Sequence, residues 1–525
     1  MSGIIFNQDC DAYQNSRAGE RLDRQAVASW VDQYAQTQVK ELFLNVNAMR
    51  AAFDSKVWDS YWSGYLPDAP DGQAWFKGVP QSWFDAIPRE HLAPLRACVH
   101  TAWQLNHDGI DVYAVWTGRC RQVGISPWLS MRMNDVHYTG DRLHPFHSEF
   151  WRSRSDLWRV GYRATWWEDR ALDYGKTEVR EYVLRLVREI AQRYDFDGLE
   201  LDWMRHLGHL RPGHERQDAA CLTDLVREVR KILDERQRLA GHPIHLAVRV
   251  PSRPNVAYEH GLDVIDWARQ GLVKTVTASP SWGTCEQDMP LEVWRQLLAG
   301  TDILLAAALE INLTPYPGFP SYPVNSLETV RGLASSYLDR GADRVYLFNY
   351  FDSDVHQARK TGALPTGPDL PPRERSLLCD DYATMLREIG NLDTLAGKPR
   401  RHVLTYATSA APGEPVCAPL PALCKAPGWV SFLLYTGPRP AVGSATVLLG
   451  ILDKPDIRPE TLHVRLNGER CPFRSRAELG QPKPDFPVYV FETPVSAMLP
   501  RSNLIEVSSP DDITIGWVEL AIRPA

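Results

Sequence analysis

Residues 194–206, YDFDGLELDWMRH, decide the predicted fold of this chain. The stretch follows a helix-like run at 178–193 and forms a short apolar segment that ends in acidic residues. In an extended strand Glu200 and Asp202 lie on one side and Leu201 lies on the other. A strand of a parallel barrel has this pattern when its apolar side chains face the helices and its carboxylates face the mouth. The segment therefore predicts a barrel strand with a functional tip.

Strand-like and helix-like segments alternate up to about residue 397. The predicted strands are 3–9, 39–47, 125–134, 196–203, 242–250, 273–279, 301–311 and 343–351. The stretches between them have helical periodicity, and several end on Gly just before the next strand. We therefore predict an α/β fold, a (β/α)8 TIM barrel. A doubly wound open sheet is the alternative, but it normally carries a Gly-rich phosphate turn after its first strand, and this sequence has none there.

The C-terminal part of the chain has a different pattern. A stretch rich in Pro, Ala and Gly at 409–428 interrupts it, and short alternating runs separated by turn residues follow. Such runs are typical of a β-sandwich. We predict two domains, a catalytic barrel over 1–399 and a small all-β sandwich over 400–525.

Composition limits the classes of partner. The 525 residues carry a net charge of −7 and no basic run, which argues against nucleic acid. No apolar stretch reaches about 18 residues, so we expect no membrane partner. The N-terminus lacks the features of a signal peptide, so we expect a cytoplasmic protein, or a periplasmic or secreted one if a leader was removed. The 18 Trp and 20 Tyr provide aromatic faces that can stack on sugar rings.

Polar residues recur on one side of the predicted strands near their C-terminal ends. Asn45 and Asn47 alternate with apolar residues, and Arg132 and Arg249 end two other strands in the same way. Polar groups that converge are costly to bury unless they pair or bind a ligand, and barrel mouths are where active sites occur. The alternative is a self-satisfied hydrogen-bonded layer that only closes the barrel.

Asp202 and Glu310 are the predicted catalytic pair. They end the fourth and seventh strands, whose tips lie across the mouth, and glycoside hydrolysis needs two carboxyl groups that flank one bond. Glu310 follows the apolar run 303–309, where burial favours the protonated form and the role of acid. Asp202 lies near Arg205 and His206, which favours a nucleophile or base.

Structural ion pairs are the alternative for both carboxylates. Asp202 would then pair with Arg249 or Arg132, and Glu310 with Arg249. Glu200 lies two residues before Asp202 on the same strand, deeper in the barrel, and is expected to orient a neighbouring side chain. The reserve candidates are Asp135, Glu168, Asp169 and Asp352.

The stretch RMNDVHY at 132–138 places four polar residue types at one strand end and predicts recognition of substrate hydroxyls. Asp135 and His137 could ligate a metal, but the sequence shows no third ligand, so we predict no metal and no cofactor. Trp282 is a predicted stacking platform, and the long Trp-rich loop 139–170 a lid or subsite wall. The predicted substrate-binding residues are Asn47, Arg132, Asn134, Asp135, His137, Glu200, Arg205, His206, Arg249, Trp282, Asn349 and Tyr350.

Residues 173–205 resemble bacterial glycosyl-hydrolase-like proteins of the family-10-like (β/α)8 group, with support from 124–138, 279–284 and 305–311. The resemblance covers most of 1–399 and implies glycoside hydrolysis. The strand tip is Leu201-Asp202 where family 10 xylanases have Asn-Glu, so xylanase activity is not implied.

The same segment is similar to the chitinase-like signature DGxDxDxE, but Glu200 replaces an Asp and Met204 replaces the catalytic Glu. Several retaining α-glycosidase barrels carry an Asp nucleophile on this strand, which favours an α-linked substrate. The tail resembles the small β-sandwiches appended to glycosidase barrels.

The sequence thus predicts a glycoside hydrolase of an oligo- or polysaccharide that uses a two-carboxylate mechanism. One alternative is a non-catalytic carbohydrate-binding protein on a hydrolase-like barrel. Another is a metal-dependent hydrolase or lyase built on Asp135, His137 and His206. The expected partner is a carbohydrate; the sugar, the stereochemical outcome and homo-oligomer formation are left open.

Overall fold

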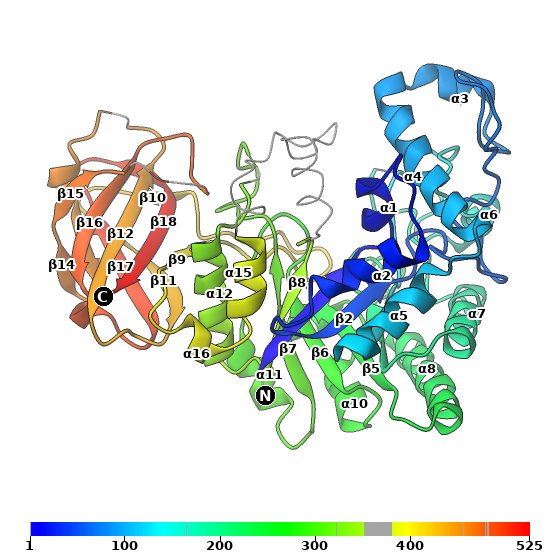
Figure 1. The fold of residues 1–525 in the computed structure, drawn as a ribbon. Helices are drawn as coiled ribbons and strands as arrows, with labels where there is room; N and C mark the ends of the chain where they lie inside the picture. The colour runs from blue at the N-terminus through cyan, green and yellow to red at the C-terminus, as the bar shows by residue number, and fades with distance from the viewer. Residues whose placement is uncertain are drawn as a thin grey trace.

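The computed structural model describes residues 2–350 except 164 and 322, and residues 381–525 except 455, 478, 480 and 481. Its first part is a closed barrel of eight parallel strands surrounded by helices, and its last part consists of antiparallel sheets (Figure 1). The predicted α/β class and (β/α)8 barrel are confirmed. The reserve candidate Asp352 lies outside the described residues.

The barrel strands follow one another around the barrel in chain order. They are β1 (Gly3–Gln8), β2 (Val39–Asn45), β3 (Ser126–Arg132), β4 (Gly198–Asp202), β5 (His245–Pro251), β6 (Thr275–Ser279), β7 (Leu304–Glu310) and β8 (Arg344–Phe348). β8 pairs with β1 and closes the barrel. All eight predicted strands overlap these elements, because each carries the apolar and β-branched residues of a buried parallel strand.

The interior of the barrel explains the glycine of the deciding segment. A side chain at Gly198 would place its Cβ 2.2 Å from the Trp128 ring, which stacks on Phe43 with ring centroids 4.8 Å apart. Only a glycine leaves room for this indole at the start of β4. Aromatic and small side chains fill the rest of the interior, including Tyr346 and Ala308. The barrel is therefore a packed core with its functional surface at one end.

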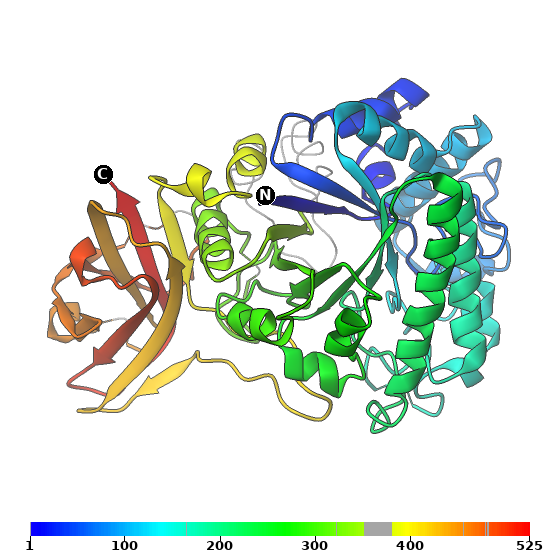
Figure 2. The ribbon, with the colours of Figure 1, turned by 90° about the horizontal axis from the view of Figure 1, so that it is seen from below.

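Helices cover the outside of the barrel (Figure 2). The helices described in this part of the chain are α1 (Ala12–Ser16), α2 (Arg24–Asp32), α3 (Gln81–Ala86), α4 (Arg89–His107), α5 (Val112–Val123), α6 (Glu149–Ser153), α7 (Thr177–Arg193), α8 (Ala219–Ala240), α9 (Pro254–Glu259), α10 (Val264–Arg269), α11 (Leu291–Leu297), α12 (Leu327–Asp339), α15 (Tyr382–Glu388) and α16 (Leu392–Leu395), and α3 lies away from the barrel in Figure 1. The buried stripe of α7 includes Val179, Val183 and Ile190, at helical spacing. The predicted termination of helices at glycine is present in α5 and α8, whose C-terminal caps Gly124 and Gly241 adopt the left-handed conformation.

The C-terminal sheets pack around a second apolar core. Their strands are β9 (Arg400–Val403), β10 (Ala422–Cys424), β11 (Trp429–Gly437), β12 (Gly443–Ile451), β13 (His463–Leu466), β14 (Glu469–Cys471), β15 (Phe473–Arg476), β16 (Val488–Pro494), β17 (Arg501–Ser508) and β18 (Ile513–Pro524). One sheet has the order β10-β18-β12-β16-β15, with β9 also on β18, and the other has the order β11-β17-β13-β14. Because β9 begins at Arg400, we retain the division into 1–399 and 400–525 as a proposal.

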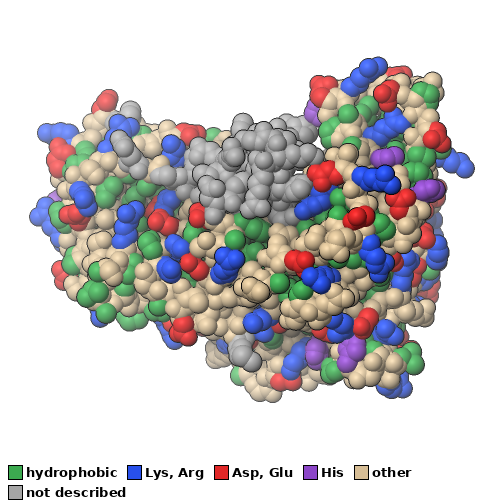
Figure 3. Space-filling view, in the orientation of Figure 1, with side chains coloured by type: hydrophobic (Ala, Val, Ile, Leu, Met, Phe, Trp, Pro, Cys, Tyr) green, Lys and Arg blue, Asp and Glu red, His purple; other side chains and the backbone are tan. Residues whose placement is uncertain are grey.

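Polar contacts join the barrel to the sheets. The Gln287 side chain donates to the Leu433 carbonyl at 3.2 Å and accepts from the Tyr435 amide at 3.0 Å. The backbone amide of Thr408 donates to the Glu286 carboxylate at 2.8 Å. Charged side chains of both signs are interspersed on the face shown in Figure 3. Within the described ranges, no helix combines the length and apolarity that a membrane crossing requires.

Candidate active site at the barrel mouth

Asp202 lies at the tip of β4, where neighbouring strands and the following loop fix it. Its Oδ1 accepts the backbone amides of Met204 and Arg205 at 2.9 and 3.1 Å. The Nε atom of Arg249, the β5 residue paired in register, lies 3.2 Å from the same oxygen. None of these three contacts involves Oδ2. Amide donors and a guanidinium stabilise the ionised carboxylate, so Asp202 has the surroundings of a nucleophile or a base.

Arg249 is wholly buried beside Asp202. Its guanidinium lies over the Phe348 ring, with 3.8 Å between the guanidinium carbon and the ring centroid. The predicted structural ion pair between Asp202 and Arg249 is therefore present. It also acts as a positioning contact, because it turns one oxygen of the carboxylate toward β5. For Arg249, a direct contact with substrate remains a prediction.

Glu310 occupies the tip of β7 and is wholly buried. The amide nitrogen of Asn349 donates to both of its carboxylate oxygens, at 3.0 and 2.9 Å. Asn349 follows β8 with φ of 64°, a left-handed conformation that Asn tolerates better than most residues. This backbone turn aims the amide across to β7. The predicted partner Arg249 does not supply this contact; a neutral amide does.

Glu200 lies one layer deeper on β4. The hydroxyls of Ser130 and Tyr346 donate to its Oε1 at 2.7 and 2.9 Å. Complete burial, and then the nearby charge of Asp202, raise the pKa of Glu200 to about 8. A protonated acid held by two hydroxyls supports the predicted orienting role better than a contact with substrate.

We expect Glu200→Gln to stabilise the protein at pH 9 relative to wild type by about 1–3 kcal/mol, and to have little effect at pH 5. In the folded wild-type protein the pKa of Glu200 lies above the ordinary value of 4.5. The contribution of Glu200 to wild-type stability is therefore complete below pH 4.5 and is lost as pH rises through about 8. Denaturant unfolding of both proteins at pH 5, 7 and 9 measures the difference. Glu286, with a pKa raised to about 7, affects both proteins equally. Parallel stability curves would refute the assignment.

A second polar group links β1 to the loop after β3. Arg132 lies 2.5 Å from Asp9 and 3.0 Å from Asp135. The Nδ1 atom of His137 lies 2.7 Å from the Asp135 carboxylate. Burial alone would raise the pKa of Asp135, but His137, Arg132 and His206 hold it well below its usual value. Asp135 is therefore an anion at the centre of this group.

Arg205 and His206 complete the mouth. An Nη atom of Arg205 lies 3.0 Å from Nε2 of His137, and its charge also acts on Glu310. The His206 side chain is 93% buried, its nearest carboxylate oxygen is 4.0 Å away on Asp135, and burial holds its pKa well below the usual value. Arg205 thus connects the loop after β4 to the polar group of Arg132, Asp135 and His137, and the charge of Arg205 also acts on Glu310 at the end of β7.

An aromatic cavity adjoins this group. It measures about 280 Å³, and its lining includes Tyr138, Trp166, Trp167 and Arg170. The three aromatic side chains are exposed, and the Trp167 ring meets the His206 ring edge-on, with centroids 5.0 Å apart. Exposed aromatic faces beside polar groups suit a sugar ring. The loop 139–170, predicted as a lid or subsite wall, thus supplies most of the cavity wall.

Four of the predicted substrate-binding residues have other surroundings. The side-chain amide of Asn47 forms hydrogen bonds of 3.0 and 3.1 Å with the backbone of Arg132. The side-chain amide of Asn134 forms two hydrogen bonds of 3.0 Å with the backbone of Leu172. Tyr350 is wholly buried, packs in the core outside the barrel and contacts the Glu310 carbonyl at 3.2 Å. Trp282 is 44% exposed. Asn47 and Asn134 therefore shape the mouth and Tyr350 packs behind it. Of these four residues, Trp282 is the one for which contact with substrate stays a prediction.

Two side chains of the site are absent from the predicted site residues. Asp9 pairs with Arg132, and Tyr138 lines the aromatic cavity. Both had a usable signal, because Asp9 directly follows the first strand and Tyr138 ends the polar stretch 132–138. The sequence does not predict the left-handed φ of 60° at Tyr138, which depends on the fold of the loop. Of the reserve carboxylates, Glu168 lies 3.7 Å from Arg159 and Asp169 lies 3.2 Å from Arg163, so both belong to loop ion pairs.

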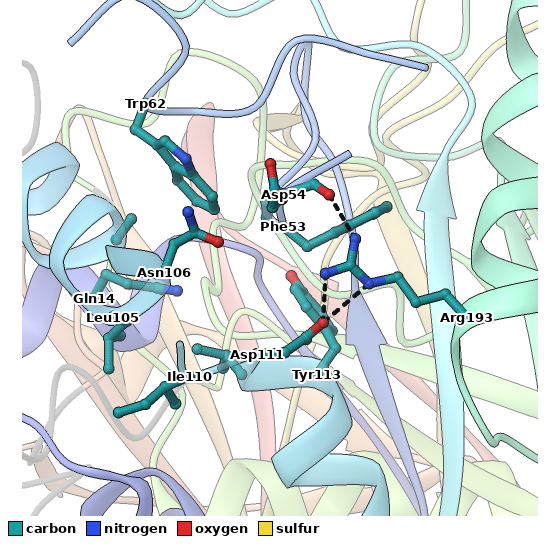
Figure 4. Close-up of a pocket in the computed structure, with 13 residues that line it drawn as sticks. Gln14, Phe53, Asp54, Trp62, Leu105, Asn106, Ile110, Asp111, Tyr113 and Arg193 are labelled. Carbon is teal, nitrogen blue, oxygen red and sulfur yellow. Dashed lines mark hydrogen bonds and ion pairs between the residues drawn. The ribbon is translucent and has the colours of Figure 1, made fainter. Parts of the chain in front are cut away.

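Two other cavities lie away from these residues. The one in Figure 4 measures about 20 Å³, space for a single water, and Arg193 and Asp111 form an ion pair of 2.7 Å at its wall. Another, of about 450 Å³, is lined by residues of 71–96, including Trp75 and Arg96. Neither is lined by a mouth residue.

Comparison with known proteins yields structural neighbours only. No family model matches the chain, and no curated protein does. A chitinase from Bacillus thuringiensis is 9% identical with a TM-score of 0.38, over 99% of this chain and all of that one. An α-L-fucosidase from Paenibacillus thiaminolyticus is 13% identical with a TM-score of 0.33, over 96% of each chain. A chitinase from a Paenibacillus species is 11% identical with a TM-score of 0.38, over 98% of this chain and 56% of that one. These neighbours are glycoside hydrolases, but similarity at this level identifies no function, and the family-10-like resemblance is not confirmed.

Proposed function

We propose that this chain is a glycoside hydrolase in which Asp202 and Glu310 act on one glycosidic bond. The observation that carries the proposal is a pair of buried carboxylates at the tips of two strands of a closed barrel. Counting around the barrel, β4 and β7 are three steps apart in one direction and five in the other, so their tips lie on different sides of the mouth, which supports the proposal. Two carboxyl groups that flank a bond are the requirement of glycoside hydrolysis.

Glu310 is the acid of the proposal and Asp202 the nucleophile or base. Glu310 is wholly buried at the end of the apolar run 303–309, and burial of a carboxyl group favours its protonated form. Asp202 accepts two backbone amides and has a guanidinium within 3.2 Å, an arrangement that suits an anionic nucleophile or base. Glu310 would protonate the glycosidic oxygen as the bond to the anomeric carbon breaks. Asp202 would bond to that carbon through Oδ2, or remove a proton from the attacking water.

The aromatic cavity supports a carbohydrate as substrate. Trp166, Trp167 and Tyr138 offer ring faces, and His206 connects the cavity to the polar mouth. Arg132, Asp135, His137, Arg205 and His206 are the proposed hydroxyl-binding groups, with Trp282 as an additional platform. The Asp at the tip of β4 favours an α-linked bond, as the resemblance implies.

We expect the full-length protein to hydrolyse at least one member of a panel of aryl α- and β-glycosides and oligosaccharides. The same substrate should survive incubation with Glu310→Gln, which cannot donate the proton. Product release followed by chromatography is the measurement, and each protein is tested with and without a chelator.

The two alternatives give different results in this experiment. Sugar binding without hydrolysis across the panel would favour a carbohydrate-binding protein. Hydrolysis that needs metal and persists in Glu310→Gln would favour the metal-dependent enzyme and exclude Glu310 as the acid.

A further inference from the structure

We propose that Asp135, His137 and His206 form a binding site for a divalent transition-metal ion, with Zn²⁺ as the representative. Each residue offers one ligand atom, and these three atoms lie within 4.8 Å of one another. Two of the residues come from the loop after β3 and the third from the loop after β4. The site therefore forms only when the barrel brings the two loops together.

His206 provides independent support for a ligand. Its side chain is 93% buried, and neither ring nitrogen has a hydrogen-bond partner among the described residues. Its neighbours are the rings of His137 and Trp167, whose centroids lie 5.1 and 5.0 Å away. Burying a polar group without a partner is costly, and buried polar groups are nearly always satisfied. A metal ion would satisfy one of these nitrogens.

The donor set fits a first-row transition metal. Two imidazoles and one carboxylate are the ligand types of catalytic zinc sites, which keep a further position open. The aromatic cavity adjoins the cluster through Trp167. The open position would take a water molecule or a hydroxyl oxygen of the substrate.

Arg132 orients the carboxylate for this role. It holds Oδ2 of Asp135 at 3.0 Å, while Oδ1 lies 2.7 Å from His137 and 4.0 Å from His206. Oδ1 is therefore the oxygen that faces both imidazoles. A contact to the second oxygen of a ligating carboxylate is the usual outer-shell support of a metal site.

Charge at the site acts in both directions. The Asp135 carboxylate favours a cation, although Arg132 lies 3.0 Å from its other oxygen. Arg205 opposes binding directly, because its nitrogen lies 3.0 Å from Nε2 of His137. Metal binding thus requires His137 to open its contact with either Arg205 or Asp135.

This inference is independent of the two-carboxylate mechanism, so its test measures metal and not turnover. The full-length protein is freed of metal with a chelator, dialysed and titrated with Zn²⁺ by calorimetry. We expect one ion per chain. His206→Gln should weaken binding by at least about 100-fold, because it removes a ligand and not merely an outer-shell contact. His91→Ala, on the exposed surface of α4, is the matched control and should bind as wild type does.

Two further measurements separate ligation from folding. Co²⁺ added to the metal-free wild-type protein should give the visible absorption of a site with nitrogen ligands. This measurement uses wild type alone, so it does not depend on whether a variant folds. Arg205→Gln should bind Zn²⁺ more tightly than wild type, because it removes the opposing charge. Absence of Zn²⁺ and Co²⁺ binding to wild type would overturn the proposal, and so would equal Zn²⁺ affinity in a folded His206→Gln.

Discussion

Asp202→Asn is expected to lower kcat for glycoside hydrolysis by at least about 10³-fold, with the affinity for sugar nearly unchanged. The asparagine keeps the oxygen that accepts the Met204 and Arg205 amides at 2.9 and 3.1 Å, so the loop after β4 should retain its shape. It removes the charged oxygen that would attack the anomeric carbon or activate water. The measurements are kcat, KM and calorimetric sugar binding.

Asp197→Asn is the matched control for this variant. Asp197 directly precedes the same strand at its opposite end and pairs with Arg121 at 2.8 Å. It should retain wild-type turnover. Full activity in Asp202→Asn would remove Asp202 from the mechanism. Loss of both binding and cooperative unfolding would instead identify its ion pair with Arg249 as purely structural.

Arg249→Met is expected to lower the free energy of unfolding by about 3–5 kcal/mol, because it leaves a buried carboxylate without its cation. Arg249 and Asp202 are both buried, with 3.2 Å between the guanidinium and the carboxylate. The double variant Asp202→Asn/Arg249→Met should lose much less than the sum of the single variants, because no unpaired charge remains. Denaturant unfolding of the four proteins gives this coupling energy.

An exposed ion pair provides the control for the second prediction. Arg227 and Asp224 lie 2.8 Å apart on the surface of α8. Arg227→Met should change stability by less than about 0.5 kcal/mol. If Arg249→Met were equally mild, the mouth would be more hydrated than its burial indicates.

Much of the fold could be predicted because each part of it depends on local pattern. The apolar alternation of 196–203, the helical stripe of α7 and the glycine ends of α5 and α8 are all properties of short segments. Parallel barrel strands are buried on both sides, so their sequences differ clearly from those of the surrounding helices. The polar strand tips followed from the same alternation, which is why Asp202 and Glu310 could be placed at the ends of β4 and β7.

Prediction was weaker where the chain leaves regular geometry. Asn349 has a left-handed φ of 64°, which interrupts the strand alternation after Phe348. Its amide therefore reaches Glu310, and the next residue, Tyr350, enters the core outside the barrel. Strict alternation cannot place either side chain. Asn47 and Asn134 were correctly assigned to the mouth, but their backbone partners come from other strands and loops.

The sequence by itself determined the barrel, the β-rich tail and the two carboxylate tips, because alternation and turn residues act over a few neighbours. Only the tertiary structure decided which groups meet: Asp202 with Arg249, Glu310 with Asn349, and His206 with Asp135. Such pairings depend on strand register and loop paths, and these follow from packing of the whole barrel rather than from any short segment.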